Sequence, residues 1–147
     1  MATGRYTSDL VPGDVLGPVE YNMSRFVARE YAHANELHQP CFQHVDGQLA
    51  PPTLVHIDKL RLYKLACPGG AGPSARIHYE FDATVHVPVP AGTRMRSTGR
   101  VTERYNKKGR DYVVTDIEMR GAADDKLYIS YRDTVILSFK SKEGGAS

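Results

Sequence analysis

Cysteine, tryptophan and long apolar runs are what this sequence has least of. The 147-residue chain contains two cysteines, Cys41 and Cys67, no Cys-x-x-Cys pair and no tryptophan. Two thiols this far apart exclude a zinc ribbon or a disulfide scaffold and are typical of a reducing compartment. The apolar runs are too short to predict a transmembrane helix, and residues 1–9 lack the apolar core of a signal peptide. We therefore expect a cytoplasmic protein with no membrane partner.

Net charge is also small. Lysine and arginine number 19 against 17 aspartates and glutamates, so the formal net charge is +2. A balance this close to neutral excludes a strongly basic nucleic-acid-binding domain. The length and the 41% hydrophobic content are those of one ordinary globular domain. We expect a single domain over residues 1–147, with the polar, glycine-rich residues 141–147 forming a flexible tail.

The first half of the chain has two helical patterns. Ser24 is a good N-cap for a helix of about three turns over residues 25–34. Proline in a first helical turn is favourable, so Pro51 and Pro52 predict the start of a second helix. Its apolar residues recur at spacings of three and four up to residue 65, and the proline- and glycine-rich segment 67–73 ends it.

The second half reads as four strands. Residues 77–89 alternate between apolar and polar side chains, which predicts a strand with one buried face, its odd-numbered positions. Further strands are predicted over residues 93–105, 111–120 and 127–139, with a hairpin turn at residues 106–109. Short turns between strands imply antiparallel pairing. The pattern predicts an α+β domain in which a curved antiparallel sheet is wrapped around a central helix, with exposed edges that a second copy would cover.

Two segments add a family resemblance to this outline. The run from Tyr31 to Pro40, followed by Leu49-Ala50-Pro51-Pro52-Thr53, resembles MaoC-like acyl dehydratases and hydratases, and most closely their N-terminal dehydratase-domain subgroup. The turn at residues 88–93 resembles a turn of that family, and residues 100–114 resemble the hairpin that follows it. The likeness covers roughly residues 10–140 and implies a single hotdog fold.

The resemblance implies an activity and a place for it. In the family an Asp–His pair acts on an acyl thioester and adds or removes water. The N-terminus of the central helix offers backbone N–H groups to the thioester oxygen, where negative charge develops. In this chain the corresponding amides would be those of Thr53 and Leu54. The substrate would be an acyl thioester, carried by coenzyme A or an acyl carrier protein, or a related small molecule. The protein would be a homodimer.

This sequence departs from the family at the catalytic pair. Aligned on Pro40, the family's aspartate falls on Leu37 and its histidine on Phe42, and neither side chain transfers protons. Neighbouring polar residues that could replace the pair are Glu36, His38, His44 and Asp46.

The candidate roles follow from these positions. We expect His38 and His44 to transfer protons, because histidine titrates near neutral pH. Either Glu36 or Asp46 would assist. The expected substrate-binding residues are Tyr31, Phe42, Thr53, Leu54 and Tyr63.

Two alternatives remain open. The pocket could serve a dehydratase/cyclase that closes a ring on a polyketide intermediate, with the hydroxyls of Tyr31 or Tyr63 taking part. The chain could also be the non-catalytic, substrate-binding half of a two-protein hotdog dehydratase, whose partner would supply the missing pair. In that case the assembly would be a heterodimer.

Three further observations complete the expectations. Asp133 interrupts the apolar face of the last strand, and we expect it to be a structural partner of Arg132 or another arginine, or to turn outward at a bulge. Arg94, Arg96, Arg100 and Arg104 share even-numbered positions of one strand. This pattern favours a solvated sheet face over a site for phosphates. The histidines lack metal-ligand spacing, so we expect neither a metal nor a cofactor.

Overall fold

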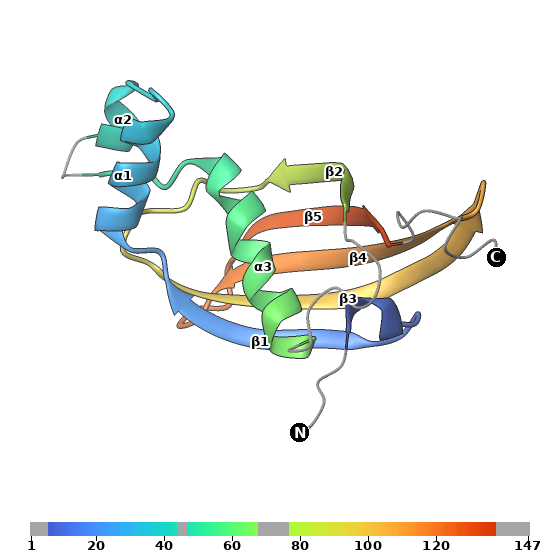
Figure 1. Cartoon of the computed structure of the whole chain (residues 1–147). Coiled ribbons are helices and arrows are strands. Elements are labelled where there is room, and N and C mark those ends of the chain that lie inside the picture. The colour runs from blue at the N-terminus through green and yellow to red at the C-terminus, as the bar shows by residue number, and fades with distance from the viewer. Residues whose placement is uncertain (1–5, 44–46, 68–76, 138–147) are drawn as a thin grey trace.

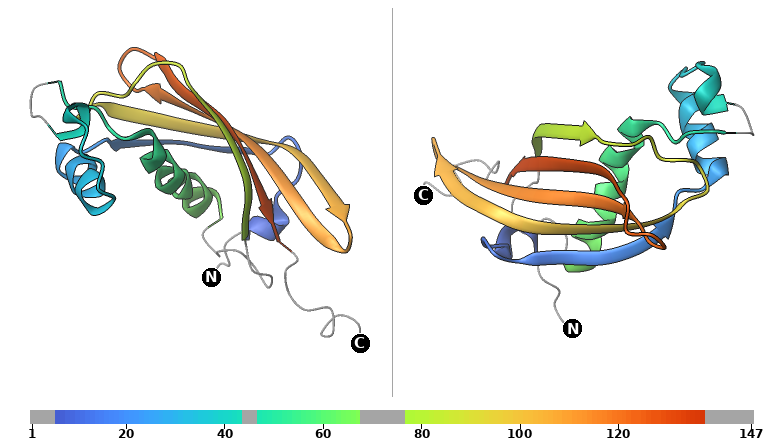
Figure 2. Two further views of the ribbon diagram at one scale, coloured as in Figure 1. Left: turned by 90° about the horizontal axis from the view of Figure 1, so that it is seen from above. Right: turned by 180° about the vertical axis from the view of Figure 1, so that it is seen from behind.

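The computed structural model describes residues 6–43, 47–67 and 77–137 (Figure 1). The tail predicted for residues 141–147 therefore lies outside the described residues. One antiparallel sheet, with its helices on one side, makes up the described chain (Figure 2). No described helix is long and apolar enough to cross a membrane.

The sheet has five strands in the order β1-β3-β4-β5-β2, and every pair of neighbours is antiparallel. In chain order the strands are β1 (Val15–Asn22), β2 (Ile77–Val85), β3 (Arg94–Lys107), β4 (Arg110–Gly121) and β5 (Leu127–Ile136). The four predicted strands are confirmed. The hairpin between β3 and β4 turns at Lys108 and Gly109, which both have positive φ, as a two-residue hairpin loop requires.

The predicted helices are confirmed as well. Helix α1 (Arg25–Ala34) begins where expected, since the Ser24 hydroxyl oxygen accepts a hydrogen bond of 3.2 Å from the Val27 amide. The second helix starts with a 3-10 turn, η2 (Pro52–Leu54), and continues as α3 (Val55–Ala66). Two short helices were not predicted, η1 (Thr7–Asp9) and α2 (Pro40–Gln43).

Strand β1 was missed by the sequence analysis. Its pairing with β3 shifts between Leu16 and Val19, at a bulge that contains Gly17 and Pro18. These two residues hide the alternation that would have revealed a strand. A proline is tolerated here because β1 lies at the edge of the sheet, where an amide is not needed on the outer side.

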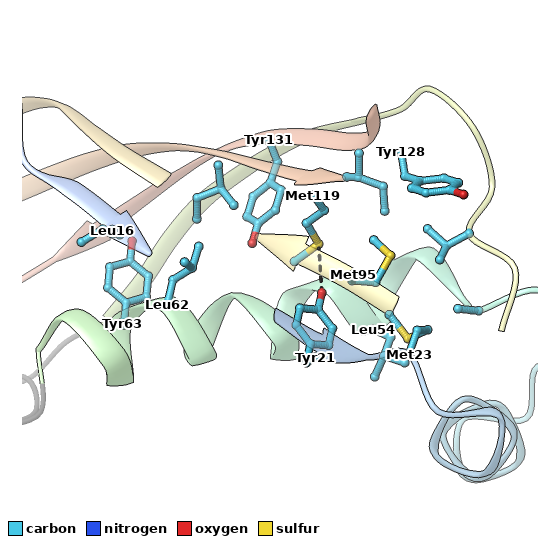
Figure 3. Close-up of a cluster of buried hydrophobic side chains, with 14 of the residues drawn as sticks. Leu16, Tyr21, Met23, Leu54, Leu62, Tyr63, Met95, Met119, Tyr128 and Tyr131 are labelled. Carbon is cyan, nitrogen blue, oxygen red and sulfur yellow. Dashed lines mark hydrogen bonds between the residues drawn. The ribbon is translucent and has the colours of Figure 1, made fainter. Parts of the chain in front are cut away.

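The core lies between α3 and the inner face of the sheet (Figure 3). Strand β4 contributes the four side chains that its alternation predicts, all less than 2% exposed: Val113, Thr115, Ile117 and Met119. From α3, Leu62 and Tyr63 point toward the sheet. Within this core the Tyr21 hydroxyl, from β1, donates to the Met119 sulfur over 3.6 Å (Figure 3).

Strand β2 departs from its prediction in two ways. It ends at Val85 rather than residue 89, because the chain bends over residues 86–87. Its odd-numbered side chains are also not uniformly buried: Tyr79 is 53% exposed and Val85 is 43% exposed. The physical reason is position, since β2 is the edge strand and, among the described residues, pairs only with β5.

The bulge in β1 brings the backbone close to α3. Gly17 has a φ of +85°, and a Cβ atom there would lie 2.7 Å from Leu62 Cδ2 and 2.8 Å from the Ser97 carbonyl oxygen. Only glycine fits both the conformation and the space. The contact between Gly17 and Leu62 therefore determines how closely α3 approaches β1.

A Gly17→Ala substitution tests this contact. We expect it to lower the free energy of unfolding by about 1–3 kcal/mol more than Gly13→Ala does, because overpacking adds to the backbone strain. Gly13 is the matched control, since its φ is +98° but a Cβ there would meet nothing within 4 Å. Urea unfolding of both variants measures the difference. Equal losses would show that the close approach to Leu62 has no energetic weight.

Candidate active site at the start of the central helix

The segments that carry the family resemblance meet at one hydrogen bond. The Tyr31 hydroxyl, from α1, donates to the Thr53 hydroxyl oxygen in η2 over 2.9 Å. Tyr31 is half-buried, and Thr53 is exposed. Because the Thr53 oxygen accepts the proton of Tyr31, its own O–H remains able to donate to a further group.

Local backbone contacts hold this pair in place. The Ala50 amide donates to the Val89 carbonyl over 2.8 Å, and Leu49 forms a β-bridge with Pro90. Both contacts tie the segment before η2 to the turn that resembles the family's. Thr53 therefore sits at the junction of α1, the start of α3 and the chain that enters β3.

The two backbone amides expected to bind the thioester oxygen are not equivalent. The Leu54 amide donates to the Pro51 carbonyl over 3.0 Å, inside the 3-10 turn, and the Leu54 side chain is only 3% exposed. This amide is therefore engaged, which corrects the expectation that both are available to a ligand. The Thr53 hydroxyl is a further donor at this helix start. The sequence analysis had placed Thr53 among the substrate contacts through its amide, without this role for its side chain.

The candidate proton-transfer residues lie in the connection after α1. Glu36 has a φ of +56° and is exposed, and His38 is exposed as well. Within the described part of the chain, no hydrogen bond joins the side chains of these two residues. His44 and Asp46 fall outside the described residues, so their roles remain expectations.

Leu37 and Phe42, which the resemblance led us to expect at the positions of a catalytic pair, are both half-buried. The Leu37 amide donates to the Ala32 carbonyl over 2.8 Å, which closes the end of α1.

A second polar group lies deeper, between α3 and the sheet. Asp133 on β5 is fully buried, and its Oδ1 lies 2.6 Å from the Lys59 ammonium, which is itself 4% exposed. The Tyr63 hydroxyl donates to Asp133 Oδ2 over 2.9 Å and lies 3.3 Å from the Thr115 hydroxyl. We refer to Lys59, Tyr63, Thr115 and Asp133 as the core polar cluster.

This cluster corrects two expectations. Asp133 pairs with a lysine rather than an arginine and does not turn outward. Arg132 lies on the opposite face, where it donates to both oxygens of Asp116 over 2.9 and 3.3 Å. Tyr63, expected at the substrate, is 2% exposed, and its hydroxyl is bonded within the core. Lys59 was missed, although a lysine four positions before Tyr63 on an apolar helix was a usable signal.

The arginine pattern on β3 divides between the two faces of the sheet. A bulge between Val101 and Glu103 shifts the register, and Arg104 turns inward to donate to the carbonyls of Ser8 and Leu10. Its expected place beside the other arginines was therefore wrong. On the outer face Arg94 pairs with Glu20 and Arg96 pairs with Asp125.

Two hollows on the described sheet lie away from Thr53. One of about 270 Å³ on the outer face of the sheet is lined by Asp82, Asp116, Ser130 and Arg132, among others. The Asp116 hydrogen bonds raise the pKa of the Arg132 guanidinium. The charged side chains that line this hollow include Arg132 and Asp116, which form an ion pair with each other. Among the described residues, no group of three or more His, Cys, Asp or Glu side chains is placed to hold a metal ion.

Solved structures identify the fold. A chain of the HadBC (3R-hydroxyacyl-ACP dehydratase) complex of Mycobacterium tuberculosis is 20% identical, with a TM-score of 0.76 over 86% of this chain and 97% of that one. The MaoC-like dehydratase of Rhodospirillum rubrum is 14% identical, with a TM-score of 0.71 over 94% and 99%. The R-hydratase PhaJ1 of Pseudomonas aeruginosa is 12% identical, with a TM-score of 0.68 over 93% and 88%.

This chain therefore has the hotdog fold, as the sequence predicted. At these identities the likeness establishes the fold alone. No protein-family model matches the sequence, and a search of curated proteins finds no match.

The core polar cluster leads to a prediction about stability. We expect Asp133→Ala to lower the free energy of unfolding by about 3–5 kcal/mol, because it leaves the Lys59 ammonium buried without its carboxylate. Asp116→Ala, which removes the exposed pair with Arg132, should cost no more than about 1 kcal/mol. Chemical denaturation of both variants makes the comparison. Similar losses would show that burial adds nothing to the Lys59–Asp133 pair.

Proposed function

We propose that this chain is a MaoC-like hydratase or dehydratase that adds or removes water on an acyl thioester or a polyketide-type intermediate. The observation that carries the proposal is the 2.9 Å hydrogen bond from Tyr31 to Thr53. It joins the two segments that resemble the family, and it leaves an exposed hydroxyl at the start of the central helix. The hotdog fold is compatible with this chemistry and supports it.

The Thr53 hydroxyl acts on the thioester oxygen. When water adds to an enoyl thioester, negative charge builds up on that oxygen. A hydroxyl that donates a hydrogen bond there stabilises the transition state more than the ground state. Tyr31 strengthens the effect, because a hydroxyl that accepts one hydrogen bond becomes a better donor in the next. The positive end of the α3 dipole adds to it.

Proton transfer falls to the segment between α1 and η2. One group removes a proton from water as the oxygen bonds to the β-carbon, and another delivers a proton to the α-carbon. Dehydration runs through the same steps in reverse. His38 is exposed beside the half-buried Leu37, where a side chain can reach a ligand. We assign these transfers to His38 and His44, with Glu36 or Asp46 assisting.

A second candidate function rests on two apolar side chains, Leu37 and Phe42. Leu37 and Phe42 occupy the positions of the family's acid and base, as expected of a subunit that binds substrate and leaves the chemistry to another chain. The HadBC dehydratase is a two-protein complex. In this reading the Thr53 hydroxyl binds the thioester, and a second hotdog protein supplies the proton-transfer groups.

Strand β2 supports a dimer in either reading. Its side chains at Tyr79, Ala83 and Val85 are exposed, although the alternation marks this face as one to be buried. The other edge, β1, is interrupted by the bulge at Gly17 and Pro18. An edge that is open and partly apolar pairs readily with another strand. If the chain is the enzyme, we assign β2 as the surface that meets a second copy of this chain; in the second reading the same edge would meet the other hotdog protein.

Thr53→Val tests the role of the hydroxyl. We expect kcat for hydration of crotonyl-coenzyme A to fall by about 10²-fold, as when one oxyanion donor is removed. Thr84→Val, which alters an exposed threonine on β2, is the control and should leave the rate unchanged. An unaltered rate in the Thr53 variant would contradict the proposal.

The activity of the purified chain separates the two candidate functions. An enzyme hydrates crotonyl-coenzyme A by itself. A binding subunit does not, but calorimetry should still detect binding of the thioester, weakened by Thr53→Val. A chain that shows neither hydration nor binding would contradict both readings.

Introducing positive charge on β2 tests whether this strand forms the dimer surface. We expect light scattering to give twice 16.3 kDa for the native chain and 16.3 kDa for a variant carrying Tyr79→Lys and Val85→Lys. Two lysines on an edge strand oppose strand pairing. Val15→Lys, at a side chain 56% exposed on the opposite edge, should remain dimeric. A native mass of 16.3 kDa would exclude the homodimer.

A further inference from the structure

The core polar cluster holds α3 at two points one helical turn apart. Lys59 and Tyr63 are four positions apart on the same face of α3, and each bonds a different oxygen of Asp133, at 2.6 and 2.9 Å. One buried carboxylate therefore bridges two successive turns. Hydrogen bonds are directional, so this arrangement sets both the rotation of α3 about its axis and its position along that axis.

The sheet side of the cluster is equally well defined. Asp133 lies in a row across three strands, with Phe81 opposite it on β2 and Thr115 opposite it on β4. The Tyr63 hydroxyl lies 3.3 Å from the Thr115 hydroxyl, and the Lys59 ammonium lies 5.6 Å from the centre of the Phe81 ring. The cluster therefore joins α3 to β2, β4 and β5 together.

Stability alone does not account for such a cluster. Replacing a buried ion pair by apolar residues of similar volume is often neutral or stabilising. Apolar contacts, moreover, tolerate small rotations and shifts, whereas a shared carboxylate does not. What the cluster supplies beyond apolar packing is a defined placement of α3.

The start of α3 is the part of the helix where placement matters. Thr53 precedes Lys59 by six residues, a distance of about 9 Å along a helix. The Tyr31–Thr53 hydrogen bond spans two elements, so a shift of α3 along its axis changes that contact directly. A misplacement of about 1 Å at a reacting centre can cost 10²-fold in rate.

We propose that Lys59, Tyr63 and Asp133 are positioning residues that place the Thr53 hydroxyl for its ligand. This inference rests on the proposed function of Thr53. The three residues act through α3 and contact no ligand themselves. Their effect on the reaction is therefore exerted at Thr53 and disappears when the Thr53 hydroxyl is absent.

The test variant combines Lys59→Met with Asp133→Asn. It removes both charges together, so no buried charge is left alone, and the amide oxygen of the introduced asparagine can still accept from Tyr63. The matched control combines Arg132→Met with Asp116→Asn, which removes an ion pair from the opposite face of the same strand. If the test variant does not fold, Tyr63→Phe removes only the hydroxyl and carries the same expectations on a smaller scale.

The first readout is independent of activity. The Leu54 amide is bonded to Pro51 in the turn that begins the helix, so its hydrogen exchange reports whether that turn keeps its geometry. We expect its protection to fall at least about tenfold in the test variant, at an unfolding midpoint that differs little from that of the native chain. The control should keep native protection. Unchanged protection in the test variant would overturn the inference.

The second readout is a double-mutant cycle with Thr53→Val. We expect the test variant to lower kcat for crotonyl-coenzyme A hydration by about tenfold to 10²-fold with little change in KM. In the Thr53→Val background the same two substitutions should change kcat less than twofold, because the group they position is gone. Effects that multiply would overturn the inference. In a chain that binds without catalysing, the dissociation constant replaces kcat in the same cycle.

The two proposals fail in different ways. If Thr53→Val alone changes neither rate nor binding, the proposed function of Thr53 is wrong, and so is the assignment of these residues to it. If Thr53→Val has its expected effect but the cluster variant keeps native Leu54 protection and native kcat, only the positioning role is wrong.

Discussion

The attachment of α3 to the sheet is the constraint on which the rest of the structure depends. Two side chains of the helix share the carboxylate of Asp133, and Leu62 packs against a strand whose backbone can come that close only at Gly17. These contacts lie toward opposite edges of the sheet, on β5 and β1. Together they determine where α3 begins, and the 3-10 turn just before it carries Thr53, whose hydroxyl accepts from Tyr31 of α1.

The candidate site shows how a common fold is adapted through its side chains. The hotdog fold supplies a helix start, and fold alone does not determine chemistry. Here the Leu54 amide is used inside its own turn, and the Thr53 hydroxyl, supported by Tyr31, is the group left facing outward. Leu37 and Phe42 lie half-buried in the segment after α1, with the exposed His38 between them in the sequence.

Prediction from the sequence succeeded where local signals are strong. The Ser24 cap, the alternation of β4 and the hairpin glycine at position 109 each depend on neighbouring residues only, and all three are confirmed. Strand β1 was not predicted, because Gly17 and Pro18 interrupt its alternating pattern. The prediction that Arg104 lies on the outer face was wrong for a related reason. One extra residue in a bulge moves every later side chain to the other face.

The amino-acid sequence by itself determined the class of fold, two of its helices, four of its strands and the segment where the candidate site lies, because periodicity, caps and turns are local properties. Only the tertiary structure decided which distant polar groups meet. Lys59 and Asp133 are 74 positions apart, and Tyr31 and Thr53 are 22 apart. Nothing in either neighbourhood encodes those pairs, since they arise when a curved sheet and a helix bury their faces against each other.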